Sequence, residues 1–519
     1  MNEQISNIAT FLFTNMEGST RLWEEQPDYD LLSEKEKTLL CRLSVFAGGW
    51  TLEAAEKACS DDAVIAAPSP GLAASMPPDP ASAISEQELL GLLSSLVDKN
   101  LVVFDERAGR YRLLETVRQY AGERLSESGN DDESDGIRRR HLDYLLVLAE
   151  EAEPHLKGAE QQAWLERLET EHDNLRAALG FALLLPTDSG LRLAAAAWWL
   201  WYVRGYLGEG RRRLAAMLGS ASAHEHTERR AMALNGAGVL AYNQGDYAPA
   251  RALYEESLAI RREAGDRRGV AGSLCNLGNV AHVQGDYASA RALYEESVAV
   301  FRELGDRQGV AGSLCNLGSV ADDQGDYTSA RALYEESVAV FRELGDRRGV
   351  AMSLDNLGIV ADRQGDRGSA RALHEESLAI RRDLRDLRGA AISLHNLGIV
   401  ALEQGDHATA RALHEESLAI RRELGDRWGV AFSLEGIAAV ASALSGPDRA
   451  ASIWGSAERL REGIGSPVTS RERSDYDRLI AGARAALGDD AAFDRAWQEG
   501  REMTLVQAIE YALEETDLP

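Results

Sequence analysis

Four asparagines recur at forty-residue intervals, and their side-chain amides are the groups in this chain best placed to bind another molecule. They are Asn276, Asn316, Asn356 and Asn396. An amide both donates and accepts hydrogen bonds, so a row of amides can hold an extended polypeptide backbone whatever its side chains are. The same amides could instead bond to neighbouring backbone between repeats, and they would then serve only the fold.

Other positions of the repeated segment differ from copy to copy. Counted from the alanine five residues before each asparagine, position five holds Asn235, Cys275, Cys315, Asp355 and His395. Position nine holds Val239, Asn279, Ser319, Ile359 and Ile399, and position twelve holds Tyr242, His282, Asp322, Asp362 and Leu402. Spacings of four and three place these positions on one stripe of a helix. Variation among near-identical copies favours contact with a ligand, although drift on an idle surface would also produce it.

Residue patterns typical of catalysis or metal binding are missing. No glycine is followed by lysine, so the chain has no phosphate-binding loop of the Gly-Lys-Ser/Thr type. His224 and His226 are two potential ligands without a third, and Cys275 and Cys315 are more consistent with small packing residues than with nucleophiles. We expect no catalytic residue, no cofactor site and no metal site. Positions two, five and nine also carry no lysine or arginine, which argues against capture of a carboxylate.

The elements that must position the asparagines are pairs of helices. Leucine recurs at position four and glycine at position eight, so that a second helix can approach closely above the glycine. Gln-Gly-Asp, as at residues 284–286, ends one helix with glycine and begins the next with aspartate. A unit of this period cannot bury its own apolar face, so neighbouring units must stack.

This pattern resembles the tetratricopeptide repeat, in the longer form found in kinesin light chains and bacterial signalling proteins. The residues that carry the resemblance in one copy are Leu277, Gly278, Gly285, Tyr287, Ala290 and Tyr294. It covers residues 190–460 and implies a mostly α fold, in which helix pairs form a right-handed superhelix with leading helices lining a concave groove.

Two further resemblances precede the repeats. The run from Thr10 to Trp23 resembles the start of class III nucleotide cyclases, but Asn15 stands where that family has a metal-binding aspartate, and the rest of that domain is missing. Residues 30–50, 93–102 and 111–121 resemble the winged-helix segment of bacterial STAND-type ATPases, and residues 164–179 resemble the connector to their repeats. The arrangement resembles a cyclase–ATPase–repeat regulator that lacks its middle, as a natural short form or a deletion product.

We therefore expect five regions. They are a cyclase-like remnant (1–28), a winged-helix-like domain (29–128) with a Pro-rich insertion (61–84), a helical connector (129–189), a tetratricopeptide-repeat solenoid (190–465) and a helical cap (466–519). Within the second region the patterns predict helices at 34–43, 52–59, 86–96 and 115–125 and strands at 101–104 and 110–113. We expect a charged break at 130–135 and helix over most of 137–184.

Charge and cysteine content limit the partners. The formal net charge is −28 over 519 residues, which opposes binding to nucleic acid and to anionic lipid. Four cysteines in a chain of this size favour a reducing cytoplasm, and no apolar run reaches the length of a membrane span. No nucleic acid and no membrane are therefore expected as partners.

The leading hypothesis is a cytoplasmic, non-catalytic signalling adaptor that binds a peptide or protein in the repeat groove. One alternative is a transcriptional regulator that acts through the winged helix, and another is a regulatory remnant of a cyclase or ATPase without its own activity. The groove candidates are the four asparagines together with Asn235, Cys275, Cys315, Asp355, His395, Asn279, Ser319, His282, Asp322 and Asp362.

Overall fold

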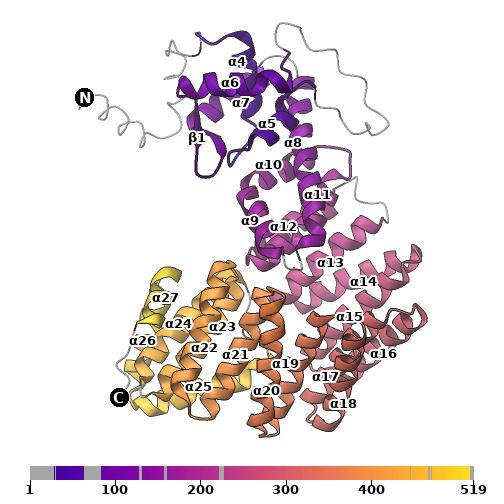
Figure 1. Ribbon diagram of the computed structural model, residues 1–519, viewed down its shortest axis with the longest axis vertical. Coiled ribbons are helices and arrows are strands. Elements are labelled where there is room, and N and C mark those ends of the chain that lie inside the picture. The colour runs from indigo at the N-terminus through magenta and orange to yellow at the C-terminus, as the bar shows by residue number, and fades with distance from the viewer. Residues whose placement is uncertain are drawn as a thin grey trace. The chain divides into compact units, whose positions relative to one another are not determined.

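The computed structural model of the protein describes residues 29–514, except 30, 63–82, 128–130, 157–159, 221–226, 445, 466–467 and 469. The chain divides into two compact units, residues 1–153 with 166–193 and residues 154–165 with 194–519 (Figure 1). The cyclase-like run at 10–23, the His224–His226 pair and most of the Pro-rich insertion lie outside the described residues.

The first unit combines short helices with one β-hairpin. Its elements are α4 (Glu34–Leu43), α5 (Leu52–Cys59), α6 (Glu86–Asp98), β1 (Val102–Asp105), β2 (Arg110–Leu113), α7 (Glu115–Glu127), α8 (Asp131–Ala152) and α10 (His172–Ala182). β1 and β2 are antiparallel, with Val102 opposite Leu113. Leu39, Trp50 and Leu93 are fully buried in the core that these elements enclose.

Local capping explains where the first of these helices begins. The Ser33 hydroxyl accepts a hydrogen bond from the Glu36 backbone N–H, and the Glu36 carboxylate accepts one from the Ser33 backbone N–H. This reciprocal pair satisfies two backbone donors that a helix start would otherwise leave open. The predicted helices and strands of this unit are confirmed, with ends shifted by at most two residues.

The expected charged break at residues 130–135 is wrong, because α8 begins at Asp131 and runs through the acidic run. Acidic residues are favourable in the first turn of a helix, where the backbone dipole is positive. Glu133 also accepts hydrogen bonds from Arg42 Nε and Nη2 at 3.2 and 3.0 Å, and this contact ties the start of α8 to α4.

The second unit is a superhelical array of helix pairs followed by a helical cap. Between the units along the chain lie η1 (Glu153–His155) and α9 (Gln161–Thr170), and α11 (Ser189–Val203) leads into the array. The array continues with α12 (Leu207–Leu218), α13 (Glu228–Asn243), α14 (Tyr247–Glu263), α15 (Arg267–Val283), α16 (Tyr287–Glu303), α17 (Arg307–Asp323), α18 (Tyr327–Glu343), α19 (Arg347–Arg363), α20 (Arg367–Asp383), α21 (Leu387–Glu403), α22 (His407–Glu423), α23 (Arg427–Ala443) and α24 (Pro447–Ile464). The last three helices are α25 (Ser470–Leu487), α26 (Asp490–Glu502) and α27 (Leu505–Leu513).

The glycine at position eight lets each leading helix approach its trailing helix. A Cβ atom on Gly278 would lie 2.5 Å from Tyr294 Cε1, and one on Gly358 would lie 2.6 Å from His374 Cε1. Real Cβ contacts are essentially never this short, so the ring of the trailing helix occupies the space that a larger residue would need. The predicted role of the Leu-x-x-x-Gly pattern is confirmed.

Within the four helix pairs from α15 to α22, a glycine turn separates the two helices and an aspartate caps the second one. Gly285 has φ 78°, a left-handed conformation that glycine adopts without strain. Asp286 then accepts a hydrogen bond from the Ser289 backbone N–H at 3.1 Å. The Gln-Gly-Asp pattern is thus confirmed as a helix stop followed by a helix start.

The start of the array contacts its later helices within the second unit. Arg204, after α11, donates a hydrogen bond to the backbone carbonyl of Leu424, after α22. The guanidinium of Arg388 on α21 lies 4.6 Å from the ring centre of Tyr202 on α11. The array therefore curves far enough for its first and late repeats to meet.

None of the helices in the described ranges combines the length and the apolar composition needed to span a bilayer.

Candidate functional site

The leading helices lie on the inner side of the curve. Each leading helix approaches the leading helix of the next repeat, from α15 with α17 through to α21 with α23, whereas adjacent trailing helices lie farther apart. Side chains also bridge adjacent leading helices, as between His282 on α15 and Asp323 on α17. The predicted asparagines all lie on these helices and are partly exposed.

The four amides are not equivalent. Asn276 Nδ2 donates a hydrogen bond to Asn235 Oδ1 at 2.7 Å, so this amide is used between two neighbouring leading helices. Asn316, Asn356 and Asn396 make no side-chain hydrogen bond to any residue that the structure describes. The row of amides open to a ligand therefore has three members rather than four.

Position five explains why only Asn276 has such a partner. Asn235 is the position-five residue of the preceding repeat, whereas Cys275, Cys315 and Asp355 at this position turn into the protein. Cys275 Sγ lies 3.2 Å from Ser297 Oγ, and Cys315 Sγ lies 3.1 Å from Ser337 Oγ. Cys315 and Asp355 are each only 3% exposed. The expectation that Cys315 and Asp355 face an open groove is wrong, since both are enclosed between leading and trailing helices.

Asp355 is the centre of a buried polar network. Its carboxylate binds Arg381 Nη2 at 2.8 Å, His374 Nδ1 at 2.9 Å and the hydroxyl of Ser393 at 3.0 Å. Such bonds satisfy a charge that burial would otherwise destabilise. In the next repeat His395 occupies the same position, its ring centre 5.0 Å from that of His414.

In the repeats of α15–α16 and α17–α18, position nine bonds to a tyrosine of the trailing helix. The Tyr294 hydroxyl donates to Asn279 Oδ1 at 2.6 Å, and the Tyr334 hydroxyl lies 2.9 Å from Ser319 Oγ. Where the trailing helix carries His374 or His414, which have no hydroxyl group, position nine is Ile359 or Ile399. Across these four repeats variation at position nine follows an internal partner, and Asn279 and Ser319 use polar atoms within the fold.

Position twelve joins neighbouring repeats. His282 Nε2 lies 2.9 Å from Asp323 Oδ2, and Arg363 binds Asp322 Oδ2 at 2.7 Å. Asp322 is buried, so its expected exposure in a groove is wrong. Burial and the nearby Glu403 carboxylate raise the pKa of Asp362 above the usual value for an aspartate.

Two features of the repeats were not predicted from the sequence. A serine in each trailing helix donates to a carbonyl at the start of its leading helix at 2.8–3.0 Å, and these serines are Ser257, Ser297, Ser337, Ser377 and Ser417. Their identity in every copy was the available signal. The second feature is apolar exposure on the inner face, with Met352 41% exposed and Ile392 and Ile399 each 38% exposed.

The inner face therefore has two halves. On α15 and α17 position two is glycine and position nine is bound to tyrosine, so this half offers small and internally bonded groups. On α19 and α21 the amides of Asn356 and Asn396 lie between apolar side chains, of which Met352, Ile392 and Ile399 are exposed and Ile359 is partly buried. Among the described residues, no group of three or more histidine, cysteine or acidic side chains is placed to hold a metal ion.

Comparison with known proteins gives the repeat type. The tetratricopeptide-repeat family matches residues 229–303, 309–383 and 389–462. A Mycobacterium tuberculosis protein, provisionally named an HTH-type transcriptional regulator, is 33% identical over 262 residues, which are 48% of this chain and 26% of that protein. A Mycobacterium bovis protein of the same provisional name matches equally. This chain spans about a quarter of the length of those curated relatives.

Two solved structures are similar in fold. A STAND protein with a tetratricopeptide-repeat sensor from Pyrococcus horikoshii is 14% identical, with 94% of this chain and 65% of that chain covered and a TM-score of 0.47. A Rap protein complexed with competence and sporulation factor is 12% identical, with 69% and 100% covered and a TM-score of 0.42. The repeats within residues 229–462 are tetratricopeptide repeats.

Proposed function

We propose that this chain is a non-catalytic adaptor that binds an extended peptide, or an extended segment of a protein, along the inner face of its repeats. The observation that carries the proposal is the row of Asn316, Asn356 and Asn396, whose amides are partly exposed and make no side-chain hydrogen bond within the described chain. A peptide backbone supplies the matching N–H and C=O groups.

The apolar residues beside the amides define the chemistry of the partner. Met352 and Ile392 lie on one side of the amide row, at position two, and Ile359 and Ile399 lie on the other side, at position nine. Successive side chains of an extended peptide point in opposite directions, so a backbone held by the amides would direct its side chains alternately to the two rows. We therefore propose a partner segment with bulky aliphatic side chains, uncharged where it crosses α19 and α21.

Neighbouring helices lie about 8–10 Å apart and an extended chain advances about 3.3 Å per residue, so each repeat would accommodate about three residues of the partner. The three open amides would then span about seven to nine residues. The start of the array and the winged-helix-like domain at 29–128 would dock further components or transmit the bound state. The proposed setting is the cytoplasm, where four thiols stay reduced.

Asn276 provides a matched control for the test. Phage-displayed random peptides would be selected on the full chain, and the affinity of an enriched peptide would be measured by fluorescence anisotropy. Asn316→Ala/Asn356→Ala removes two open amides and should weaken binding by about 2 kcal/mol, roughly thirtyfold in Kd. Asn276→Ala removes an amide already bonded to Asn235 and should change Kd by about twofold or less. Equal losses in the two variants would refute the proposal.

A second candidate, transcriptional regulation, is favoured by the provisional name of the mycobacterial relatives. Helix α6, which a winged helix would place against DNA, has the sequence EQELLGLLSSLVD, with three acidic residues and no lysine or arginine. Phosphate contact needs the opposite charge. A mobility-shift assay with random 30-base-pair duplex at low salt should show no complex, and a salt-sensitive complex would establish this candidate instead.

A further inference from the structure

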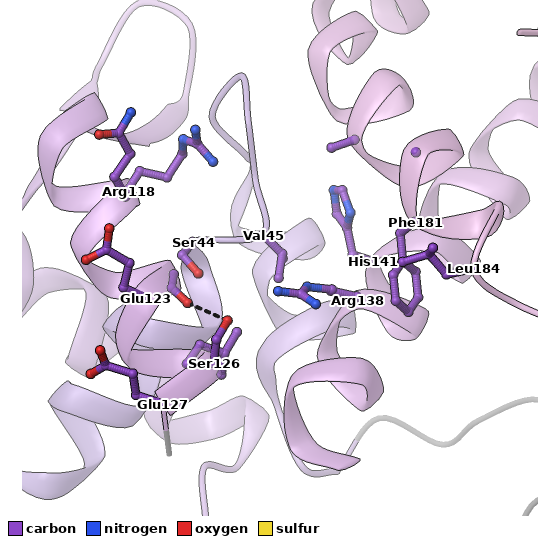
Figure 2. Close-up of a pocket in the computed structure, with 15 residues that line it drawn as sticks. Ser44, Val45, Arg118, Glu123, Ser126, Glu127, Arg138, His141, Phe181 and Leu184 are labelled. Atoms are coloured by element: carbon purple, nitrogen blue, oxygen red, sulfur yellow. Dashed lines mark hydrogen bonds between the residues drawn. The ribbon is translucent and has the colours of Figure 1, made fainter. Parts of the chain in front are cut away.

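A cavity in the first unit favours no single class of ligand. It has a volume of about 710 Å³ and lies beside α7, α8 and α10 (Figure 2). Phe181 and Leu184 border it together with charged side chains of both signs, among them Arg118, Glu123 and Arg138. Contacts within the second unit indicate a more specific role, because they involve one of the helices that carry the open amides.

Helix α11 closes the leading helices into a ring. Its Trp198 packs against α13, where a Cβ atom on Gly236 would lie 2.8 Å from Trp198 Cγ. One turn later on α11, the ring of Tyr202 contacts the guanidinium of Arg388 on α21. Helix α11 therefore bridges α13 and α21, and the open amides of α17, α19 and α21 lie on leading helices of this ring.

Polar contacts hold the two sides of the ring together. Gln162 Nε2 on α9 donates to Glu423 Oε1 on α22 at 3.0 Å, and Arg204 donates to the backbone carbonyl of Leu424. Both sides belong to the second unit. We call this contact the seam, and its residues are Gln162, Tyr202, Arg204, Arg388, Glu423 and Leu424. Small polar contacts between parts of one chain open more readily than large apolar ones.

The leucine in the seam has exposed counterparts in other repeats. Leu304, Leu344 and Leu424 each follow Arg-Glu and precede Gly-Asp in the turn after a trailing helix. Leu304 and Leu344 are 41% and 42% exposed, whereas Leu424 is 2% exposed. Opening the seam would therefore give Leu424 an exposure that the fold already tolerates at the same position of two other repeats.

The arginine in the seam has two partners within reach. Arg268, Arg348 and Arg388 occupy one repeat position, and each approaches the aspartate that caps the next leading helix, at 2.9, 3.3 and 3.8 Å. Their side chains are 73%, 41% and 17% exposed, in that order. Arg388 thus lies farthest from its aspartate, Asp426, and contacts Tyr202 across the seam instead.

The seam and the candidate groove share one side of α21. Arg388, Ile392 and Asn396 are four residues apart, so they lie on successive turns of the same face. Helix α11 therefore stands beside the part of the inner face that includes Ile392 and Asn396. A segment that lies across α17, α19 and α21 is enclosed while the seam is closed, and it can enter or leave sideways only when the seam opens.

We propose that the seam is a gate to the inner face, which opens to admit or release the partner segment and closes around the bound segment. This inference rests on the peptide-binding function proposed above. In the closed state Arg388 stacks on Tyr202, and in the open state it binds Asp426, as Arg268 and Arg348 bind their aspartates. Because one partner replaces another, the two states are close enough in free energy for ligand binding to shift their populations.

Cross-linking the seam tests the gate. Gln162→Cys/Glu423→Cys places two thiols at an exposed contact, which bismaleimidoethane can join. In stopped-flow anisotropy with the selected fluorescent peptide, cross-linking the empty chain should slow association about tenfold or more, and cross-linking the loaded chain should slow release about tenfold or more. Gln162→Cys alone, treated with the same reagent, controls for reaction at the native cysteines and should bind as the untreated chain does.

Weakening the seam should have the opposite effect. Arg204→Ala/Arg388→Ala removes both arginine contacts and should raise the association rate about fivefold, because the open state becomes more populated. Arg268→Ala/Arg348→Ala removes arginines at the position of Arg388 in repeats outside the seam, and it should leave the association rate unchanged. Circular dichroism establishes that both variants fold.

Each outcome bears on a different part of the proposal. Failure of the double-cysteine variant to form an intramolecular cross-link, followed by mass spectrometry, would show that the seam is not closed in solution. Association and release rates that cross-linking leaves unchanged would overturn the gate and leave peptide binding intact. Absence of peptide binding to every form, the weakened seam included, would instead refute the peptide-binding function and with it the gate.

Discussion

Two adjacent repeats carry a buried histidine at the same position of the trailing helix, but the two histidines differ in their hydrogen-bond partners. His374 is bonded to Asp355, which also binds Arg381. His414 has His395 beside it, no hydrogen-bond partner at either ring nitrogen among the described residues, and Arg421 in the place of Arg381. The two repeats thus differ at position five, which is Asp355 in one and His395 in the other. We call the first repeat compensated, because a carboxylate binds its buried histidine and arginine, and the second uncompensated, because it has no such carboxylate.

The comparison extends to the two repeats that carry Tyr294 and Tyr334. There position five is Cys275 or Cys315, bonded to core serines, and position nine is Asn279 or Ser319, bonded to the tyrosine hydroxyl. Across these four repeats variation at both positions therefore follows the trailing-helix residue. Near-identical copies can differ because their interiors differ, and variation alone does not identify a ligand-binding surface.

Removing the carboxylate from the compensated repeat should have the largest effect. Asp355→Ala leaves Arg381 and His374 buried without their common partner, which should cost about 3–5 kcal/mol. The urea midpoint of the full chain, followed by circular dichroism, and hydrogen exchange of α19–α21 would measure it. Asp383→Ala breaks an exposed pair with Arg347 and should cost under about 1 kcal/mol. Similar losses in the two variants would contradict the role of the network.

Acid should destabilise the uncompensated repeat. Burial lowers the pKa of His414 to about 3, well below the usual value of a histidine. Because the folded pKa lies below the unfolded one, the stabilisation is complete above about pH 6.5 and is lost as pH falls toward 3. Between pH 7 and pH 5 this amounts to about 2 kcal/mol for His414. Urea midpoints at these pH values should fall less in His414→Phe than in the unmodified chain, and parallel declines would contradict the assignment.

Installing the missing carboxylate should convert the second repeat into the first. His395→Asp places an acceptor beside His414 and Arg421, and we expect stabilisation of about 1–2 kcal/mol at pH 7. The same change should raise the pKa of His414, which NMR titration of its imidazole would follow. A destabilised variant would show that the Asp355 network depends on more than position five.

The smallest expected effect concerns a turn between these two repeats. Arg385 has φ 51°, whereas the equivalent turns use glycines such as Gly345, with φ 69°, and Gly425, with φ 64°. A side chain in this left-handed conformation is strained, so Arg385→Gly should stabilise the chain by about 1 kcal/mol. Gly345→Arg, the reverse exchange one repeat earlier, should destabilise it by a similar amount. Denaturant midpoints that move in the same direction would refute this explanation.

Much of the fold could be predicted because its signals are local. The helix starts at Ser33 and Asp286, the stop at Gly285 and the close approach at Gly278 each depend on residues a few positions apart. The candidate site was predicted less completely. Asn316, Asn356 and Asn396 stay candidates, whereas Asn276 is bonded to Asn235 and Cys315, Asp355 and Asp322 are buried.

The sequence by itself determined the repeat, its helix boundaries and the residues that share a helical face. Only the tertiary structure decided which of those residues face the interior, because positions five and six are neighbours and the edge between core and open surface runs between them. Helical periodicity fixes the angle between two side chains, but the surface that the next helix covers depends on how the repeats stack. The same stacking decided that one asparagine of four is already bonded within the fold.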